Sequence, residues 1–425
     1  MKLFVGIDVS SESLDVCYLE SNQKVLNQMT VDNSLVGAKL IQSNILLYAD
    51  NRKYEQIIIG LESTSVYSFH PATFLHQDEA LRALNVTVSV INPSKIHRFK
   101  KMFEEDKTDR VDAYRIADFL RLEIHQTSLI KEEQYMALQR LTRSRYQLVT
   151  QLTECKQHFI ENLYYKCNTL KQSIDTSIFG TTMMSLLTED VSLDEVAEMP
   201  LEDLSDFLDT KGKGRFADSE KLAKSIQKAI RSAYRLGAVM ADSVDQVLGT
   251  YAMLIKTYTK QIKILEKSIA DVLETIPEAK SLLSIPGIGP TYTAGILAEI
   301  AQIERFDNQA KLAKYAGLYW KKNQSGNFTA QNTPITKSGN HYLRYYLIEA
   351  ANSVRNNIPT FNEYYKKKKA EVPKHQHKRA LVLTARKFVR LVDVLLRNHQ
   401  LYMPERSVSL EILNISNPFS APRKN

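Results

Sequence analysis

The alternation of apolar and polar positions over the first 125 residues predicts a domain of strands and helices. Three runs separated by short polar turns predict an antiparallel meander: KLFVGIDV, LDVCYLE and KVLNQMTV. Two later β-branched runs, YEQIIIGLE and NVTVSVI, are typical of buried strands, and each follows a segment with helical spacing. One long helix, from about His97 to Glu123, is expected to close the segment. The predicted order is therefore β β β α β α β α.

From residue 126 to about residue 276 the pattern is almost entirely helical. Between Leu248 and Ile276, apolar residues recur at alternating spacings of three and four, which is the a/d seam of a coiled coil. A second, weaker seam runs from Leu138 to Phe159 and is interrupted by Arg145. Two such segments can pair within one chain or between two copies of it. The sequence therefore predicts a helical coiled-coil region at residues 126–276.

The third segment, residues 277–425, is predicted to be a mostly helical domain. It opens with SIPGIGPTYTAGILAEI, in which two helical stretches flank Pro-Gly-Ile-Gly-Pro. This is the sequence form of a helix-hairpin-helix, because Gly287 and Gly289 permit a tight turn and expose N–H groups where phosphate binds. The alternative is a purely structural turn. The expected fold class is thus α/β for the N-terminal domain plus α for the remainder.

Charge is unevenly distributed along the 425 residues, whose net charge is +8. From residue 276 onward, 23 Lys and Arg oppose 10 Asp and Glu, a net of +13, so the preceding 275 residues carry −5. A basic C-terminal third predicts neutralisation of nucleic-acid phosphates. The alternative is a basic surface that serves only solubility.

The composition indicates the cellular compartment in which the protein is expected. The three cysteines lack C-x-x-C spacing, which argues for a reducing compartment and against a zinc site or a disulfide framework. An acid occurs within eight residues of the N-terminus, so no signal peptide is expected there. No apolar run approaches the ~20 residues that a membrane span requires. We therefore expect a cytoplasmic protein without a membrane partner.

Acidic residues close two of the predicted strands. The predicted order of elements is that of a ribonuclease H-like (RuvC-like) domain, in which the first strand lies at the centre of the sheet. Asp8 ends the first strand, and Glu62 ends the fourth, its neighbour. Asp109 and Asp112 share one face of the last helix, which packs against the same sheet. A shift of register would bring in Asp106 instead.

These four carboxylates are expected to converge and to bind divalent cations. Hard cations such as Mg²⁺ prefer carboxylate oxygen. Two such ions about 4 Å apart can stabilise the attacking and leaving oxygens of a phosphodiester. The two helical aspartates repel each other by a few tenths of a kcal/mol, and bound cations would offset this repulsion. The alternative is a solvated acidic face.

Several segments together resemble one protein family. They occur in the order GIDVSSESLDV, GLESTSVY, INPSK, KTDRVDAYRIA, SIPGIGPTYTAGILAEI, LAKYAGL, NQSGN and ITKSGNHYLR. This set resembles the insertion-sequence one-hundred-and-ten family of transposases, which are DEDD-type recombinases with a RuvC-like domain, a coiled coil and a C-terminal transposase domain. The resemblance covers most of the chain. It implies a Mg²⁺-dependent transposase of a bacterial or archaeal mobile element and places its acidic tetrad on Asp8, Glu62, Asp109 and Asp112.

The resemblance also implies a serine nucleophile, which the residues alone do not single out. The matching position is Ser325 in NQSGN, where a turn is the ordinary interpretation. In the family, this serine forms a covalent phosphoserine link with DNA, so strand exchange needs no ATP. Family members are thought to act as tetramers guided by a structured RNA. The implied partners are donor and target DNA, a guide RNA, and further copies of the chain, from dimer to tetramer, joined through the coiled coil.

Two features depart from the family pattern. Ser65 stands where the family commonly has Gly, two residues before Tyr67, and the helical middle is longer than expected, mainly around residues 168–245.

Basic residues near Ser325 and on the last helices, with the two hairpin glycines, are the candidates for nucleic-acid binding. They are Gly287, Gly289, Lys321, Lys322, Lys337, Arg344, Lys378, Arg379 and Arg386.

Three other functions are compatible with parts of the pattern. A hydrolytic RuvC-like Holliday-junction nuclease would use water and never Ser325. A member of the actin and sugar-kinase superfamily would share the loop VGIDVSSESLDV, but it would also need a second Asp-Gly phosphate motif and a Gly-rich adenosine site, and the sequence contains neither. A catalytically inactive nucleic-acid scaffold would not require the four carboxylates.

Overall fold

A computed structural model of the chain describes residues 1–63, 65–103, 108–122, 132–188, 192–320 and 335–404, and the backbone of two short strands between residues 324 and 329. The chain divides into two compact units, Met1–Glu132 and Glu133–Asn425. Among the residues described, no helix is both long and apolar enough to cross a membrane.

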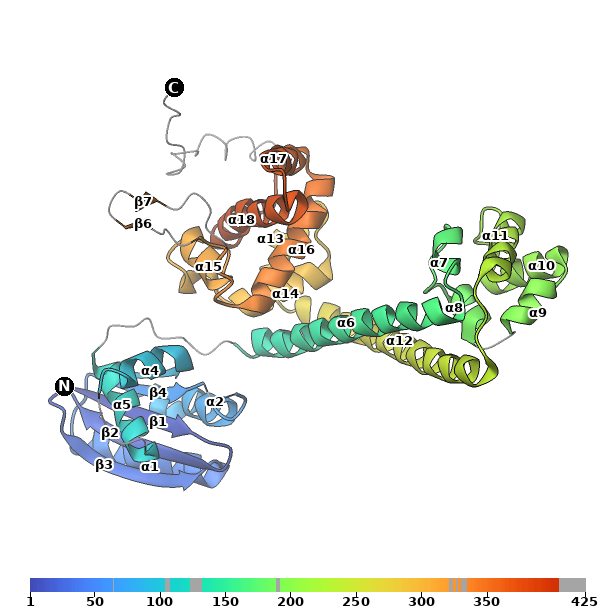
Figure 1. Cartoon of the computed structure of the whole chain (residues 1–425). Helices are drawn as coiled ribbons and strands as arrows, with labels where there is room; N and C mark the ends of the chain where they lie inside the picture. The colour runs from blue at the N-terminus through green and yellow to red at the C-terminus, as the bar shows by residue number, and fades with distance from the viewer. Residues whose placement is uncertain are drawn as a thin grey trace. The chain divides into compact units, whose positions relative to one another are not determined.

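A five-stranded mixed sheet forms the centre of the first unit (Figure 1). Its order is β3-β2-β1-β4-β5, with antiparallel pairing from β1 through β3 and parallel pairing of β4 with both β1 and β5. The structure confirms the predicted mixed α/β domain with its meander followed by parallel strands. The strands are β1 (Lys2–Val9), β2 (Ser13–Glu20), β3 (Val25–Asp32), β4 (Gln56–Glu62) and β5 (Val86–Ile91).

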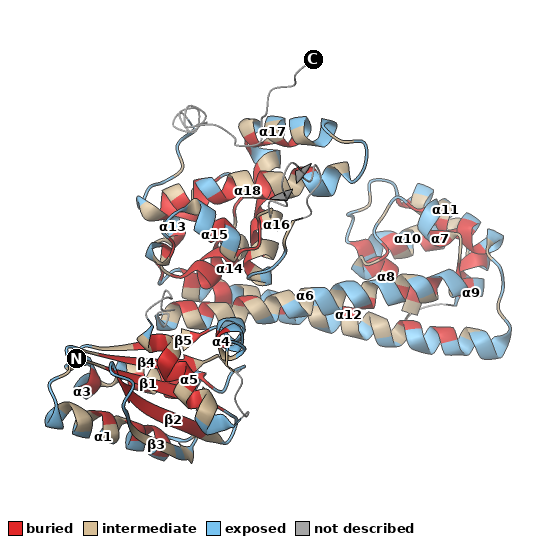
Figure 2. Ribbon diagram, turned by 60° about the vertical axis from the view of Figure 1, so that its left-hand side comes forward, coloured by how far each residue is buried: buried red, intermediate tan, exposed pale blue. Residues whose placement is uncertain are grey.

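Helices cover both faces of this sheet. Odd-numbered residues of β1, such as Val5 and Ile7, pack under α1, α2 and α3, whereas Phe4 of β1 packs under α4 and α5. Because both faces are covered, β1, β2 and β4 are almost continuously buried (Figure 2), whereas the edge strand β3 is partly exposed. The helices are α1 (Leu35–Asn51), α2 (Phe69–Gln77), α3 (Glu79–Arg82), α4 (Pro93–Lys100) and α5 (Asp109–Arg121).

The single long helix expected from His97 to Glu123 is wrong. Helix α4 ends at Lys100, and α5 begins at Asp109. Thr108 has extended backbone geometry, and its side chain accepts a hydrogen bond of 3.3 Å from the amide of Val111, so it caps a new helix. The continuous apolar spacing across this region conceals the break between the two helices.

The second unit is organised around two long helices, α6 (Glu133–Lys166) and α12 (Ala238–Leu273), which lie side by side and antiparallel (Figure 1). Ion pairs at both ends fix this orientation, because Arg145 meets Glu266 and Lys166 meets Asp245. The predicted seam of α12 is buried at every seventh position. The seam residues between these positions are half-buried. The buried seam residues are Leu248, Ile255, Ile262 and Ile269, and Ile276 follows just beyond the helix.

Within the described residues, five helices pack against the end of this pair at which α6 ends and α12 begins. They bury apolar side chains against the last turns of α6 and the first turns of α12, including Phe159, Leu163 and Leu248. The long segment around residues 168–245 is therefore a small helical bundle with its own core. Its helices are α7 (Leu170–Ser173), α8 (Thr181–Thr188), α9 (Leu193–Glu198), α10 (Leu201–Gly212) and α11 (Ser219–Ser232).

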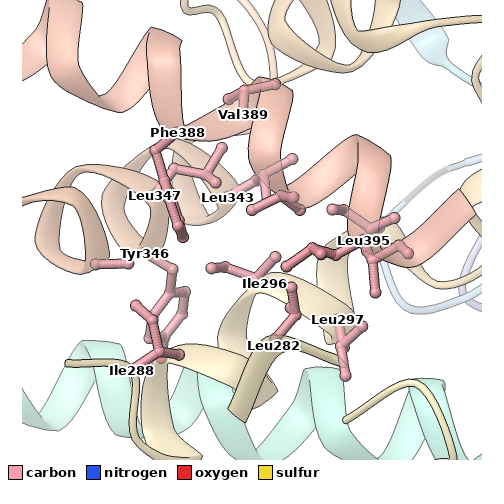
Figure 3. Close-up of a cluster of buried hydrophobic side chains, with 14 of the residues drawn as sticks. Leu282, Ile288, Ile296, Leu297, Leu343, Tyr346, Leu347, Phe388, Val389 and Leu395 are labelled. Atoms are coloured by element: carbon pink, nitrogen blue, oxygen red, sulfur yellow. The ribbon is translucent and has the colours of Figure 1, made fainter. Parts of the chain in front are cut away.

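The C-terminal helices pack around a second core, which includes Leu297, Tyr346 and Phe388 (Figure 3). Helices α13 and α14 flank the Pro-Gly-Ile-Gly-Pro turn, as the sequence predicts. The elements are α13 (Ala279–Leu283), α14 (Pro290–Ile300), a 3₁₀ turn (Ile303–Arg305), α15 (Gln309–Tyr315), β6 (Gln324–Ser325), β7 (Phe328–Thr329), α16 (His341–Asn357), α17 (Pro359–Ala370) and α18 (Gln376–Arg397).

One buried carboxylate joins the base of α6 to the C-terminal helices. Glu299 of α14 is fully buried and accepts two hydrogen bonds from the guanidinium of Arg143, at 2.7 and 2.9 Å. Gln139 and Asn340 donate to the same carboxylate at 2.9 and 2.6 Å. Burial of this charge is tolerated because both oxygens are satisfied by positive or polar donors.

Candidate metal centre

Neighbouring parallel strands carry the first two predicted carboxylates. Asp8 is the penultimate residue of the central strand β1, and Glu62 is the last residue of β4. Ile7 pairs in register with Leu61, so Asp8 and Glu62 lie at the same level of the sheet. Both alternate with residues that pack under α1, and they therefore lie on the face covered by α5.

Helix α5 brings the other two carboxylates to this point. Asp109 is its first residue and Asp112 lies one turn later. Their position in the first turn, next to the cap residue Thr108, places both charges at the positive end of the helix dipole. The dipole therefore offsets part of the repulsion between them before any cation binds.

Close packing between α5 and the sheet depends on Gly6. A Cβ at this position would overlap the carbonyl oxygen of Ala113 and the amide nitrogen of Ala117. The first turn of α5 therefore reaches Asp8 only because β1 has no side chain two residues earlier. Sequence reasoning missed this contribution, although a glycine between Val5 and Ile7 in a buried strand is itself a sign of close backbone approach.

The three aspartates form one cluster. Asp8, Asp109 and Asp112 each present a carboxylate oxygen within 4.8 Å of the other two. Burial, together with the neighbouring Asp112, Glu62 and Asp109, raises the pKa of Asp8 to about 6, although Lys100 acts in the opposite direction. The cluster is thus charged, partly desolvated and made only of hard oxygen donors, a set suited to Mg²⁺ or Mn²⁺.

Glu62 is connected to this cluster through a lysine that sequence reasoning missed. The ammonium of Lys100, the last residue of α4, lies 3.3 Å from Oε2 of Glu62 and 3.0 Å from Oδ1 of Asp112. No local pattern distinguishes it from the other basic residues of IHRFKK. The structure therefore adds a positive group to the four predicted carboxylates.

The loop after β4 contains the departure at Ser65. This residue has a φ of 52°, in the left-handed region that glycine adopts without strain. The conformation gives a physical reason for a preference for glycine at this position. The departure leaves the strand position of Glu62 intact, because β4 ends before the loop.

Ser325 lies in β6, which pairs with β7 through Ser325 and Phe328. Its side chain lies outside the described residues, as do Lys321 and Lys322. An isolated bridge between Trp320 and Ile335 closes the base of this hairpin segment.

Arg344 supports the chain next to this base. Its guanidinium donates hydrogen bonds to the carbonyls of Ala316 and Lys337, at 3.1 and 2.8 Å. The structure thus gives Arg344 a positioning role, and its predicted contact with nucleic acid stays a prediction. Lys337 itself is exposed.

The remaining candidates for nucleic-acid binding differ in their exposure to solvent and in their existing contacts. Arg379 is ion-paired with Glu371 at 3.1 Å, whereas Lys378 is exposed. Arg386 is half-buried, and one of its guanidinium nitrogens, Nη1, has no hydrogen-bond partner among the described residues. Burial and the nearby Arg390 lower the pKa of Arg386 to about 10. Any role in binding nucleic acid stays a prediction for all of them.

The two hairpin glycines occupy different environments. Gly287 has a φ of 89°, and a Cβ there would overlap the side-chain amide of Asn357. Ser353 of α16 donates a 2.6 Å hydrogen bond to its carbonyl. Gly289 is the residue before α14, and a Cβ there would meet open space. Gly287 is therefore needed for the turn and its packing, whereas a side chain could be accommodated at Gly289.

Comparison with known proteins gives matches at both ends of the chain. Residues 5–165 match the IS110 DEDD transposase model, and residues 279–366 match the model of the transposase IS116/IS110/IS902 family. The first range contains all four carboxylates, and the second contains Ser325.

Individual proteins of insertion elements are also similar to this chain. An insertion element IS116 protein of Streptomyces clavuligerus, described as an uncharacterized 44.8 kDa protein, is 25% identical over 308 residues, covering 72% of this chain and 75% of the relative. The mini-circle putative transposase for IS117 of Streptomyces coelicolor is 23% identical over 336 residues, covering 75% and 76%. An insertion element IS110 protein of the same species is 26% identical over 213 residues, covering 47% and 52%.

Proposed function

The chain belongs to the IS110 family of transposases, enzymes that recombine DNA, and we propose that it moves an insertion element by metal-dependent cleavage and rejoining of DNA. The observation that carries this proposal is the carboxylate cluster of Asp8, Asp109 and Asp112, with Glu62 beside it. The strand order and the helix on the cluster's face support a ribonuclease H-like domain, the fold in which such carboxylates hold catalytic ions.

In this proposal Asp8, Glu62, Asp109 and Asp112 hold two Mg²⁺ ions, which supply charge neutralisation at the attacking and leaving oxygens of a phosphodiester. Asp8 would serve as the central ligand because it lies on the innermost strand and is surrounded by the other three acids. The partial burial of Asp8 favours strong electrostatic stabilisation of developing charge.

Ser325 is the proposed nucleophile. Its oxygen attacks the phosphorus, its proton passes to a general base, and the bond from phosphorus to the departing sugar oxygen breaks. The product is a phosphoserine ester that conserves the bond energy for rejoining. Support comes from the family membership of residues 279–366, which contain Ser325, and from the NQSGN motif.

The partners follow from the same proposal. Donor and target DNA are the substrates, and the net charge of +13 after residue 275 supports contact with their phosphates. A structured RNA encoded beside the gene would direct the choice of site. The antiparallel helices α6 and α12 pair within one chain, so their exposed faces would join copies of the chain into dimers or tetramers in the cytoplasm.

The alternative function is hydrolysis of branched DNA by the same carboxylates with water as nucleophile. A suicide duplex carrying the sequence that flanks the gene, incubated with the flanking RNA and Mg²⁺, distinguishes the two. We expect a covalent protein–DNA adduct with the wild type and with the control Ser232→Ala, an exposed serine of the helical bundle. Ser325→Ala should bind DNA and form no adduct. Free ends without any adduct would favour the hydrolytic nuclease, and an adduct that persists in Ser325→Ala would eliminate Ser325.

A further inference from the structure

Lys100 lies between two of the four predicted metal ligands. Its ammonium bridges Glu62 and Asp112 at 3.3 and 3.0 Å, and the side chains of all three residues are at most 22% exposed. An ion pair in such surroundings is screened less than a surface pair, so its attraction is substantial. The lysine thus offsets one of the two negative charges on Glu62 and Asp112.

The position of Lys100 is fixed by its helix. Asn92 caps the start of α4 with a 2.9 Å hydrogen bond from the amide of Ser94. Ile96 is fully buried under α5, and the ring of Phe99 packs edge-on against that of Phe119 of α5, with centroids 5.4 Å apart. Because α4 is anchored against α5 in this way, the packing of the two helices places Lys100 beside the carboxylates.

The cluster therefore has two places for positive charge, and Asp112 belongs to both. One lies among the oxygens of Asp8, Asp109 and Asp112. The other lies between Glu62 and Asp112, where the ammonium is. We propose that Lys100 fills the second cation position, so that the centre takes one divalent ion readily and a second only when Lys100 is displaced.

The chemistry of lysine suits this role. Its ammonium is a compact, strongly hydrated charge on a flexible four-carbon stem, so it can pair with two carboxylates at once and then move into water. At 22% exposure the side chain retains a route to solvent. Because Lys100 must first be displaced, the second ion binds more weakly than the first. Both ions therefore bind readily only when another group, such as a DNA phosphate, draws Lys100 away from the carboxylates.

This inference rests on the proposed metal-dependent function, and Mn²⁺ titration of the full-length protein by calorimetry tests it. Lys100→Met is the test variant, and Lys101→Met is the control, because Lys101 has the same charge and is exposed. In the wild type and in Lys101→Met we expect one tighter and one weaker binding event. In Lys100→Met the weaker event should tighten about tenfold, and in Lys100→Arg, which keeps the charge, it should stay weak.

A second readout is melting temperature in EDTA and in Mn²⁺. Without metal, Lys100→Met should melt below Lys101→Met, because Glu62 and Asp112 lose their shared counter-ion, and Mn²⁺ should raise its melting temperature more. Equal titrations and equal Mn²⁺ shifts for the two variants would overturn the role of Lys100. If Asp8→Asn bound Mn²⁺ as the wild type does, the metal centre itself, and with it the proposed function, would fail instead.

Discussion

Gly6 of the central strand lies directly against the backbone of Ala113 in helix α5, with no room for a side chain between them. This contact holds the first turn of α5, and with it Asp109 and Asp112, beside Asp8. A glycine and a helix N-terminus thus determine whether acids from distant parts of the sequence meet. The carboxylates depend on this packing as much as on their own identities.

Gly6→Ala should therefore separate α5 from the sheet. We expect a loss of about 1–3 kcal/mol in the free energy of unfolding, as for other overpacked cores, together with loss of Mn²⁺ binding. Gly249→Ala is the matched control, because a Cβ at Gly249 of α12 would meet open space and alanine favours a helix by up to about 1 kcal/mol. Unchanged Mn²⁺ affinity in Gly6→Ala would contradict the positioning role of this contact.

The pKa of Asp8 predicts a pH dependence of the metal-free protein. Because burial raises this pKa from 3.8 to about 6, the folded chain binds more protons than the unfolded chain between these values. The contribution of Asp8 to stability is thus fully present below about pH 4 and is lost as the pH rises through about 6. Melting temperatures in EDTA across this range should fall more in the wild type than in Asp8→Asn. Parallel curves for the two proteins would show that Asp8 titrates normally.

Metal affinity should show the opposite trend with pH. A proton on Asp8 competes with a divalent ion, so Mn²⁺ affinity should rise as the pH increases through about 6 and then level off. Calorimetric titrations in matched buffers measure this directly. A flat profile across the same range would mean that Asp8 is not a ligand.

Glu299 of the second unit is predicted to contribute strongly to the stability of that unit. In Glu299→Ala the guanidinium of Arg143 and the amides of Gln139 and Asn340 lose their common acceptor. We expect a loss of about 3 kcal/mol in urea unfolding, compared with less than about 0.5 kcal/mol for Glu363→Ala, an exposed glutamate of α17. A similar small loss in both variants would mean that this buried network does not stabilise the joint between α6 and α14.

The pair of Arg145 and Glu266 explains how the helix seam tolerates a charge. Arg145, whose side chain is 15% exposed, reaches Glu266 of α12 at 2.7 Å. A double-mutant cycle with alanine at both positions should give a coupling energy of about 1 kcal/mol, larger than that of the exposed helical pair Glu220 and Lys224, which solvent screens. Equal coupling energies for the two pairs would indicate that the seam gains nothing from this contact.

The sequence predicts the strands and the long helices because their signals are local. Asp8 and Glu62 follow apolar runs whose length and branching identify buried strands, and a seven-residue repeat marks α12. The order of strands then brings the two acids to adjacent positions. The convergence of Asp109 and Asp112 with Asp8 follows from the covering helix.

Other features depend on tertiary packing that the sequence pattern does not contain. The break between α4 and α5 is set by the cap at Thr108, inside a stretch whose spacing suits one helix. Lys100 becomes part of the centre only because that break lets α4 end beside β4. The fully buried Glu299 likewise has partners 41 and 156 residues away. Long-range ion pairs of this kind leave no periodic trace in the sequence.

Anomalous diffraction from crystals grown with Mn²⁺ shows whether Asp8, Asp109 and Asp112 bind a divalent ion. We expect an anomalous peak in contact with oxygens of all three aspartates, and a second peak between Glu62 and Asp112 only in Lys100→Met or at high Mn²⁺ concentration. Well-ordered aspartates with no peak among them at saturating Mn²⁺ would rule out the metal centre.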